Sequence, residues 1–200
     1  MKIVFNFKTA MFLAALALLA PRPARAEGSY FSTRELLADF FRTSKDVTFK
    51  KVEIGASERA RLLKRLGYAP ARSSYTFFVA TSAGKIDGYA IIDEENGEHL
   101  PITFAVKLSP AGVVERQEVV CYRESRGDEV RDERFRRQFV GKSARDPIAA
   151  NLDIVAVSGA TISSRAMAVG VRRAVVLFEE LVKPVVTATA ASIAGRPGSL

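Results

Sequence analysis

Cysteine and histidine are almost absent from this chain of 200 residues, and their scarcity narrows the kinds of site it can hold. Cys121 is the only cysteine, so no disulfide can form within the chain, and we expect it to fill a small apolar space in a strand. His99 is the only histidine, and no cysteine or carboxylate stands at metal-ligand spacing around it. The sequence also shows no pairing of a nucleophile with a base. It therefore predicts neither a metal site nor a catalytic nucleophile.

The first 26 residues have the three-part pattern of a secretory signal peptide. A basic start at Lys2 is followed by an uncharged run over residues 9–20 and then by Ala24-Arg25-Ala26, which resembles a small-residue cleavage site. A retained membrane anchor is the alternative, because residues 3–20 approach the roughly 20 residues of a spanning helix. Cleavage is the favoured interpretation. It predicts an exported protein, in the periplasm or on the outer face of the cytoplasmic membrane.

The charge of the chain belongs partly to this leader. It holds four basic residues and no acidic one, so its removal lowers the formal net charge from +8 to +4, with 26 basic against 22 acidic residues. Such an excess suits the neighbourhood of an anionic membrane surface but is too small to indicate a nucleic-acid partner. The basic segment 131–139 is likewise predicted to be an ordinary amphipathic helix. Its pairs at helical spacing are Asp132 with Arg136, Glu133 with Arg137, and Phe135 with Phe139.

The rest of the chain predicts one α+β domain over residues 27–183, with a twisted antiparallel sheet flanked by helices. Ser32 and Glu35 have the spacing of a capping box, which starts a helix that ends near Thr43. A strand over 47–54 and a helix over 57–66, with Leu62, Leu63 and Leu66 facing inward and Gly67 as its stop, complete the first part. Residues 184–200 are predicted to be a flexible tail.

From residue 74 the hydrophobic period changes from helical to alternating. The predicted strands cover residues 75–80, 85–92, 102–108 and 113–122, with reversals at Asn96-Gly97 and at residues 109–112. Strands joined by connections this short must run antiparallel. The sequence therefore predicts a meander.

Residues 153–167 run from apolar β-branched residues through a turn of small residues into a helix that ends near Val182. Ile154, Val155 and Val157 predict the end of a buried strand, and the turn is Ser158-Gly159-Ala160-Thr161. Thr161 thus reaches a helix N-terminus, where free backbone N–H groups and the helix dipole favour a phosphate. The plainer alternative is that the hydroxyl groups here merely cap the helix. These hydroxyl groups belong to Thr161, Ser163 and Ser164.

This turn, followed by Ile162-Ser163-Ser164, resembles the flavinylation motif of the FMN-binding domain family. The family includes the C subunit of the sodium-pumping NADH:quinone oxidoreductase and the G subunit of the Rnf complex. Other segments match in order and extend the resemblance over residues 36–181. They are residues 84–89 (GKIDGY), 101–104 (PITF), 122–127 (YRESRG) and 138–142 (QFVGK).

The resemblance implies that FMN is joined through its phosphate to Thr161, with Ser158, Gly159, Ala160, Ile162 and Ser163 around it. It also implies that a loop containing Glu124, Ser125 and Gly127 borders the flavin ring. The implied partners are a flavin transferase and a membrane-bound redox donor or acceptor. One departure is that the family commonly has an aspartate where this chain has Val155, with Asp153 two positions earlier.

Three functions fit these observations. The preferred one is an exported electron carrier with FMN tethered through its phosphate to Thr161. The second is a flavin-dependent reductase of a small exported acceptor, for which Glu124 is the one acid or base that the loop offers. The third is a non-catalytic binding or sensory module that holds FMN, or another phosphorylated ligand, reversibly, and the presence of Val155 in place of the aspartate keeps this alternative open. A flavin that survives denaturation separates the first two from the third, and turnover of small acceptors without a protein partner separates the second from the first.

Overall fold

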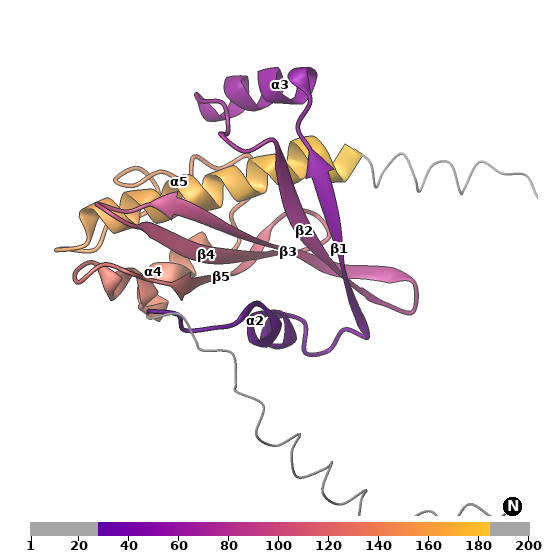
Figure 1. The fold of residues 1–200 in the computed structure, drawn as a ribbon, viewed down its shortest axis with the longest axis horizontal. Helices are drawn as coiled ribbons and strands as arrows, with labels where there is room; N and C mark the ends of the chain where they lie inside the picture. Colours follow the sequence, from indigo (N-terminus) through magenta and orange to yellow (C-terminus); the bar gives the residue numbers. More distant parts are fainter. Residues whose placement is uncertain (1–27, 185–200) are drawn as a thin grey trace, which may run out of the picture.

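The computed structural model describes residues 28–184, which form a single α+β domain around a five-stranded antiparallel sheet (Figure 1). The strand order is β1-β2-β3-β4-β5, so each strand pairs with its neighbours in sequence and the predicted meander is confirmed. The strands are β1 (Asp46–Glu53), β2 (Ser74–Ser82), β3 (Lys85–Asn96), β4 (Pro101–Leu108) and β5 (Val114–Cys121). β3 is longer than predicted because it continues through charged residues to the turn with β4.

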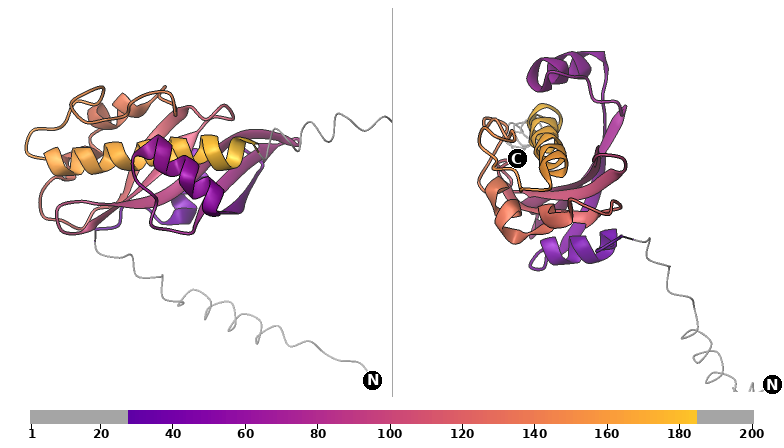
Figure 2. Two further views of the ribbon diagram at one scale, coloured as in Figure 1. Left: turned by 90° about the horizontal axis from the view of Figure 1, so that it is seen from above. Right: turned by 90° about the vertical axis from the view of Figure 1, so that its left-hand side faces the viewer.

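Helices cover both faces of the sheet (Figure 2). The short helix α2 (Thr33–Phe40) packs on one face, and the long helix α5 (Thr161–Leu177) lies across the other, beside α3 (Ala56–Leu66). The expected capping box of α2 is present at Ser32 and Glu35, and α3 ends at Gly67 in the left-handed conformation, as expected. The remaining short helices are η2 (Asp128–Arg131), α4 (Glu133–Arg136), η3 (Arg137–Phe139) and the π-helical turn η4 (Phe178–Val182).

The larger core lies between the sheet and α5. Phe178 at the end of α5 packs its ring against those of Tyr89 and Phe77, with centroids 4.8 and 6.3 Å away. In the middle of α5, Gly170 lies directly on Phe104 of β4, since a Cβ built at this glycine would stand 2.5 Å from the ring. The helix therefore approaches the sheet more closely than a side chain would permit. This packing fixes where its N-terminus comes to lie.

Three local predictions were wrong. Residues 154–157 form no strand, because the backbone of Val155 is paired with a glutamine side chain instead of a neighbouring strand. The helix predicted over residues 131–139 is divided into η2, α4 and η3, because Arg136 turns to Glu118 and the carbonyl of Gln117 instead of pairing with Asp132. Leu63 of α3 is exposed rather than inward.

Other predictions concern single residues or the ends of the chain. Cys121 is buried in β5 as expected, and His99 is exposed. The signal peptide, the alternative anchor and nearly all of the predicted tail lie outside the described residues. Within residues 28–184, none of the helices is both long enough and apolar enough to cross a membrane.

Candidate functional site

Helix α5 begins at Thr161 without a cap. The residue at the N-cap position is Ala160, which is buried and has no side chain able to accept a hydrogen bond from the first turn. Along helix α5, the first backbone N–H that has an acceptor within residues 28–184 is that of Ser164, which donates to the Ala160 carbonyl oxygen at 2.8 Å. The N–H groups of Thr161, Ile162 and Ser163 therefore remain available to an external acceptor. The capping alternative is wrong for this helix.

The hydroxyl groups of the turn fall into two kinds. Ser163 and Ser164 are buried, and their oxygens bond to the Tyr122 hydroxyl at 2.8 Å and to the Val157 N–H at 3.0 Å. Thr161 and Ser158 are exposed, and neither hydroxyl bonds to any residue in the described part of the chain. Thr161 is thus the free hydroxyl that lies on the uncapped first turn itself.

Gly159 gives the turn its shape. Its φ of +82° lies in the left-handed region that favours glycine, and no protein atom lies within 4 Å of where a Cβ would be. The space beside the turn is therefore open to solvent. Ile162 follows on the exposed side of the first helical turn, where its side chain is about half exposed.

The loop after β5 meets this helix start through Tyr122 and Gly127, so of the predicted loop residues the structure places Gly127 beside Ser163. The buried Tyr122 hydroxyl donates to the Arg126 carbonyl, and since it has a single proton, Ser163 donates to Tyr122. A Cβ at Gly127 would stand 2.5 Å from both Ser163 Oγ and Tyr122 Oη, and its φ is +89°. Burial raises the pKa of Tyr122, which keeps its proton in place. Sequence reasoning assigned Tyr122 to a strand and missed this contact.

Glu124 braces the turn between β3 and β4. Its carboxylate accepts hydrogen bonds from the N–H groups of His99 at 2.7 Å and Leu100 at 2.9 Å. Partial burial opposes its ionisation, but these backbone donors outweigh burial and hold the pKa of Glu124 below its usual value. The carboxylate is therefore ionised and engaged. Ser125, the next residue, is exposed.

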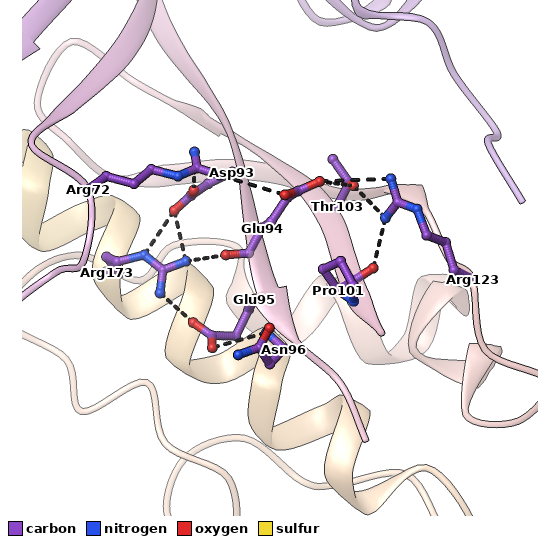
Figure 3. Close-up of polar contacts among 9 residues, drawn as sticks. All are labelled: Arg72, Asp93, Glu94, Glu95, Asn96, Pro101, Thr103, Arg123 and Arg173. Atoms are coloured by element: carbon purple, nitrogen blue, oxygen red, sulfur yellow. Dashed lines mark hydrogen bonds and ion pairs between the residues drawn. The ribbon is translucent and has the colours of Figure 1, made fainter. Parts of the chain in front are cut away.

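The two arginines of this loop have different surroundings. Arg123 donates to the Pro101 carbonyl at 2.8 Å and to Thr103 Oγ1 at 3.1 Å, so it is fixed on β4 (Figure 3). Arg126 is exposed and forms no ion pair with any residue between 28 and 184. Of the two, Arg126 is the one free to meet an anionic group.

A buried ion cluster joins α5 to β3 (Figure 3). The guanidinium of Arg173 bonds to Asp93 at 2.8 Å, to Glu95 and to the Glu94 carbonyl, and Asp93 also pairs with Arg72 at 3.0 Å. Burial alone would lower the pKa of Arg173, but the carboxylates of Asp93 and Glu95 raise it above its usual value. The cluster fixes α5 over the strand that leads to the turn held by Glu124.

The segment before the turn is held by side chains of residues 138–142. Gln138 bonds to the backbone of Val155 twice, accepting its N–H at 2.8 Å and donating to its carbonyl at 3.1 Å. Asp153 accepts from Lys142 at 2.8 Å and from the N–H of Ala149 at 2.8 Å. Partial burial opposes the ionisation of Asp153, but Lys142 and the backbone donors outweigh burial and hold the pKa of Asp153 below its usual value. Asp153 is therefore committed to the fold of the loop.

The fold and the site together define the class of protein. It is an α+β domain in which a turn of small residues leads into a helix whose N-terminus has no cap. A family model described as the FMN-binding domain matches residues 72–176. The match covers just over half of the chain, so the chain belongs to the FMN-binding domain family and FMN is its cofactor. The free N–H groups and the exposed hydroxyl at Thr161 fit the phosphate of that cofactor.

Among solved structures, the chain is similar to the crystal structure of NqrC from Shewanella oneidensis. The sequence identity is 17%, the TM-score is 0.47, and the alignment covers 74% of this chain and 85% of that one. A search of curated proteins gave no match.

Proposed function

We propose that this protein is an exported electron carrier in which FMN is joined through its phosphate to Thr161. The observation that carries the proposal is the exposed Thr161 hydroxyl at a helix start that has three free N–H groups and no cap. In forming the link, the Thr161 oxygen makes a new bond to phosphorus, the leaving group of an activated FMN donor departs, and the hydroxyl proton is lost to a base. A flavin transferase supplies the donor and the base.

The chain's own residues bind and orient the group. The N–H groups of Thr161, Ile162 and Ser163 would donate hydrogen bonds to the phosphate oxygens of bound FMN, and the helix dipole would favour their negative charge. Tyr122 and Gly127 lie against Ser163 of the same helix turn, which supports the family's placement of the loop over residues 124–127 at the border of the flavin ring. FMN itself supplies the redox chemistry, and the protein supplies position and electrostatics.

The environment of Glu124 favours a carrier over a reductase with its own acid. Glu124 is ionised and used by two backbone donors, so it has no proton to give to a substrate. We place the protein outside the cytoplasm on the pattern of residues 1–26, and its partner is then a membrane-bound redox donor or acceptor.

A module that binds FMN reversibly is a second candidate, and the surroundings of Val155 favour it. The position where the family commonly has an aspartate presents an apolar, largely exposed side chain. Asp153 cannot replace that aspartate without giving up Lys142 and two backbone donors.

The intact mass of the mature protein tests the tether, with the protein purified from an exporting host that contains the flavin transferase. We expect an added mass of one FMN less one water, mapped to the Thr161 peptide and absent from Thr161→Ala. Ser158→Ala is the matched control, because it removes the other exposed hydroxyl of the same turn and should leave the adduct intact. An FMN that washes away on unfolding would favour the reversible module, and no adduct in a competent host would refute the tether. The mass of the N-terminal peptide reports cleavage of the leader in the same sample.

A further inference from the structure

Strand β1 has a free edge. It stands at one end of the strand order, so β2 is the one strand that pairs with it within residues 28–184 (Figure 1). Proteins commonly protect an edge strand by keeping it short, by placing proline in it or by interrupting it with a β-bulge. β1 is eight residues long, contains no proline, and keeps its register with β2 over its whole length. These three barriers to a further strand are therefore missing from this edge.

The pairing with β2 determines which backbone groups of β1 face outward. The Ile54 N–H donates to the Ser73 carbonyl at 2.7 Å. The same register continues along the strand as far as Asp46, which lies opposite Thr81. In an antiparallel pair, residues bonded to the partner strand alternate with residues whose N–H and C=O groups point away from it. The odd-numbered residues of β1 therefore direct their backbone groups to the free edge. They are Val47, Phe49, Lys51 and Glu53.

Two apolar side chains of β1 are exposed on one face of the sheet. Val47 is 40% exposed and Phe49 is 73% exposed. Side chains two positions apart in a strand point to the same face. Phe49 lies opposite Phe78, which packs against the smaller core beside α2, so both exposed side chains are on the face that α2 covers. A long edge with exposed apolar residues is a site to which a further strand can add.

The charges of β1 complement those of a second copy of the same strand. In a twofold antiparallel pairing centred on Phe49, this residue meets Phe49 of the second copy. Lys45 is then opposite Glu53 of the copy, and Asp46 is diagonal to Lys50 of the copy. The two Lys50 residues are also diagonal to each other, and each has an Asp46 on its other diagonal. Opposite charges and aromatic pairs across two strands are stabilising, and the twofold axis repeats each contact.

The neighbouring registers are less favourable. Because the outward-facing residues must pair with one another, the second copy can slide only by steps of two residues. A step in one direction places Lys45 opposite Lys51 of the copy, and a step in the other places Lys50 opposite its own copy. Like charges directly opposite each other are destabilising. In the register centred on Phe49, Lys51 meets no lysine and keeps its ion pair with Glu53 at 2.8 Å.

We propose that β1 pairs antiparallel with β1 of a second copy, centred on Phe49, and joins two sheets into one continuous sheet. The dimer is independent of the proposed function. β1 and β5 are the opposite edges of the sheet, and the start of α5 is held by Tyr122 just after β5. The pairing therefore leaves the Thr161 turn of each copy outside the interface.

Sedimentation equilibrium of the mature protein tests the association. We expect a monomer–dimer equilibrium that Phe49→Asp weakens at least on the order of tenfold, because the change removes the aromatic pair and sets two carboxylates opposite each other. Leu152→Asp is the matched control, since Leu152 is 72% exposed and lies outside the sheet, and it should leave the affinity unchanged. Circular dichroism checks that both variants fold. A protein that stays monomeric at its highest soluble concentration, or equal weakening by the two changes, would overturn the proposal.

Single cysteines test the register. With diamide as the oxidant, Phe49→Cys should form a disulfide-linked dimer, because the two Cα atoms lie about 5.5 Å apart across a hydrogen-bonded pair. Val47→Cys is the matched control on the same face, where the two copies lie about 14 Å apart along the strands. The parent protein gives the background, and its Cys121 is buried. Cross-linking of Val47→Cys as fast as that of Phe49→Cys would overturn this register.

Charge reversal and removal of the flavin give two further readouts. Lys45→Glu should weaken the dimer severalfold, and adding Glu53→Lys should restore it, since the pair is exchanged across the interface. No recovery in the double variant would contradict the pairing. Thr161→Ala should dimerise like the parent. If intact mass shows no FMN, the proposed function fails while sedimentation still decides the pairing of β1.

Discussion

Replacing Tyr122 with phenylalanine should loosen the contact between the loop of residues 124–127 and the start of α5. The change keeps the ring and removes one hydroxyl, which now donates to the Arg126 carbonyl and accepts from Ser163. A neutral hydrogen bond contributes about 1 kcal/mol net, and a buried hydroxyl without a partner costs about 1–3 kcal/mol. Ser163 is buried and would be left in that state. We expect the free energy of unfolding to fall by about 2 kcal/mol, which for a domain of this size lowers Tm by about 4–8 °C.

Urea unfolding followed by circular dichroism measures this loss. Tyr89→Phe is the matched control, because Tyr89 is equally buried and its hydroxyl bonds to no residue in the described range. A double-mutant cycle of Tyr122→Phe with Ser163→Ala should give a coupling of about 1 kcal/mol. Trypsin should also cleave after the exposed Arg126 on the order of tenfold faster, since the loop opens more often. A loss no greater than that of Tyr89→Phe, or strict additivity in the cycle, would refute the reasoning.

Three further changes test the site and the core. Gly159→Ala and Gly84→Ala should each destabilise the fold by about 1 kcal/mol, because both glycines have a positive φ and open space around the position of a Cβ. Only Gly159→Ala, which lies beside Thr161, should also lower the fraction of protein that carries FMN, as measured by intact mass. Asp153→Asn should reduce the loss of stability that urea unfolding shows between about pH 5 and pH 3. The pKa of Asp153 is lower in the folded protein than in the unfolded chain, so its carboxylate stabilises the fold above the unfolded pKa, and this stability is lost as the pH falls through the folded pKa. An unchanged pH profile would contradict this role of Asp153. Gly170→Ala should destabilise by about 1–3 kcal/mol despite the better helix propensity of alanine, because the added carbon meets the buried ring of Phe104, and Phe104→Leu should recover part of the loss in thermal unfolding.

The meander and its helices could be predicted because local chemistry determines them. Short connections require antiparallel strands, the capping box starts α2, and Gly67 ends α3. Where prediction failed, a distant residue changed the local outcome. β3 continues through Asp93 and Glu95 because Arg173, about eighty positions later in the sequence, neutralises charges that would otherwise end a buried strand.

The candidate site likewise has features that could be predicted from the sequence and features that could not. The position of Thr161 at a helix start followed from the pattern of small and apolar residues, and the structure places it there. The missing cap could not be predicted, because it depends on Ser163 and Ser164 turning inward to Tyr122 and Val157. No sequence pattern indicates that Glu124 bonds to the turn between β3 and β4. Side-chain direction is set by tertiary contacts that no short motif contains.

The burial of α5 bears on how electrons could leave the protein. Nearly every residue from Ser163 to Leu177 is buried or half-buried, and Arg173 fixes the helix to the sheet, so its amides should be among the slowest in the domain to exchange with deuterium. A flavin attached at its first residue, as we propose, would be held by a stationary element and would differ from the swinging arm of a carrier domain. The redox centres of its partners would then have to reach this protein by diffusion. The frequency of these encounters, and not the motion of a tethered flavin, would limit the rate of electron transfer.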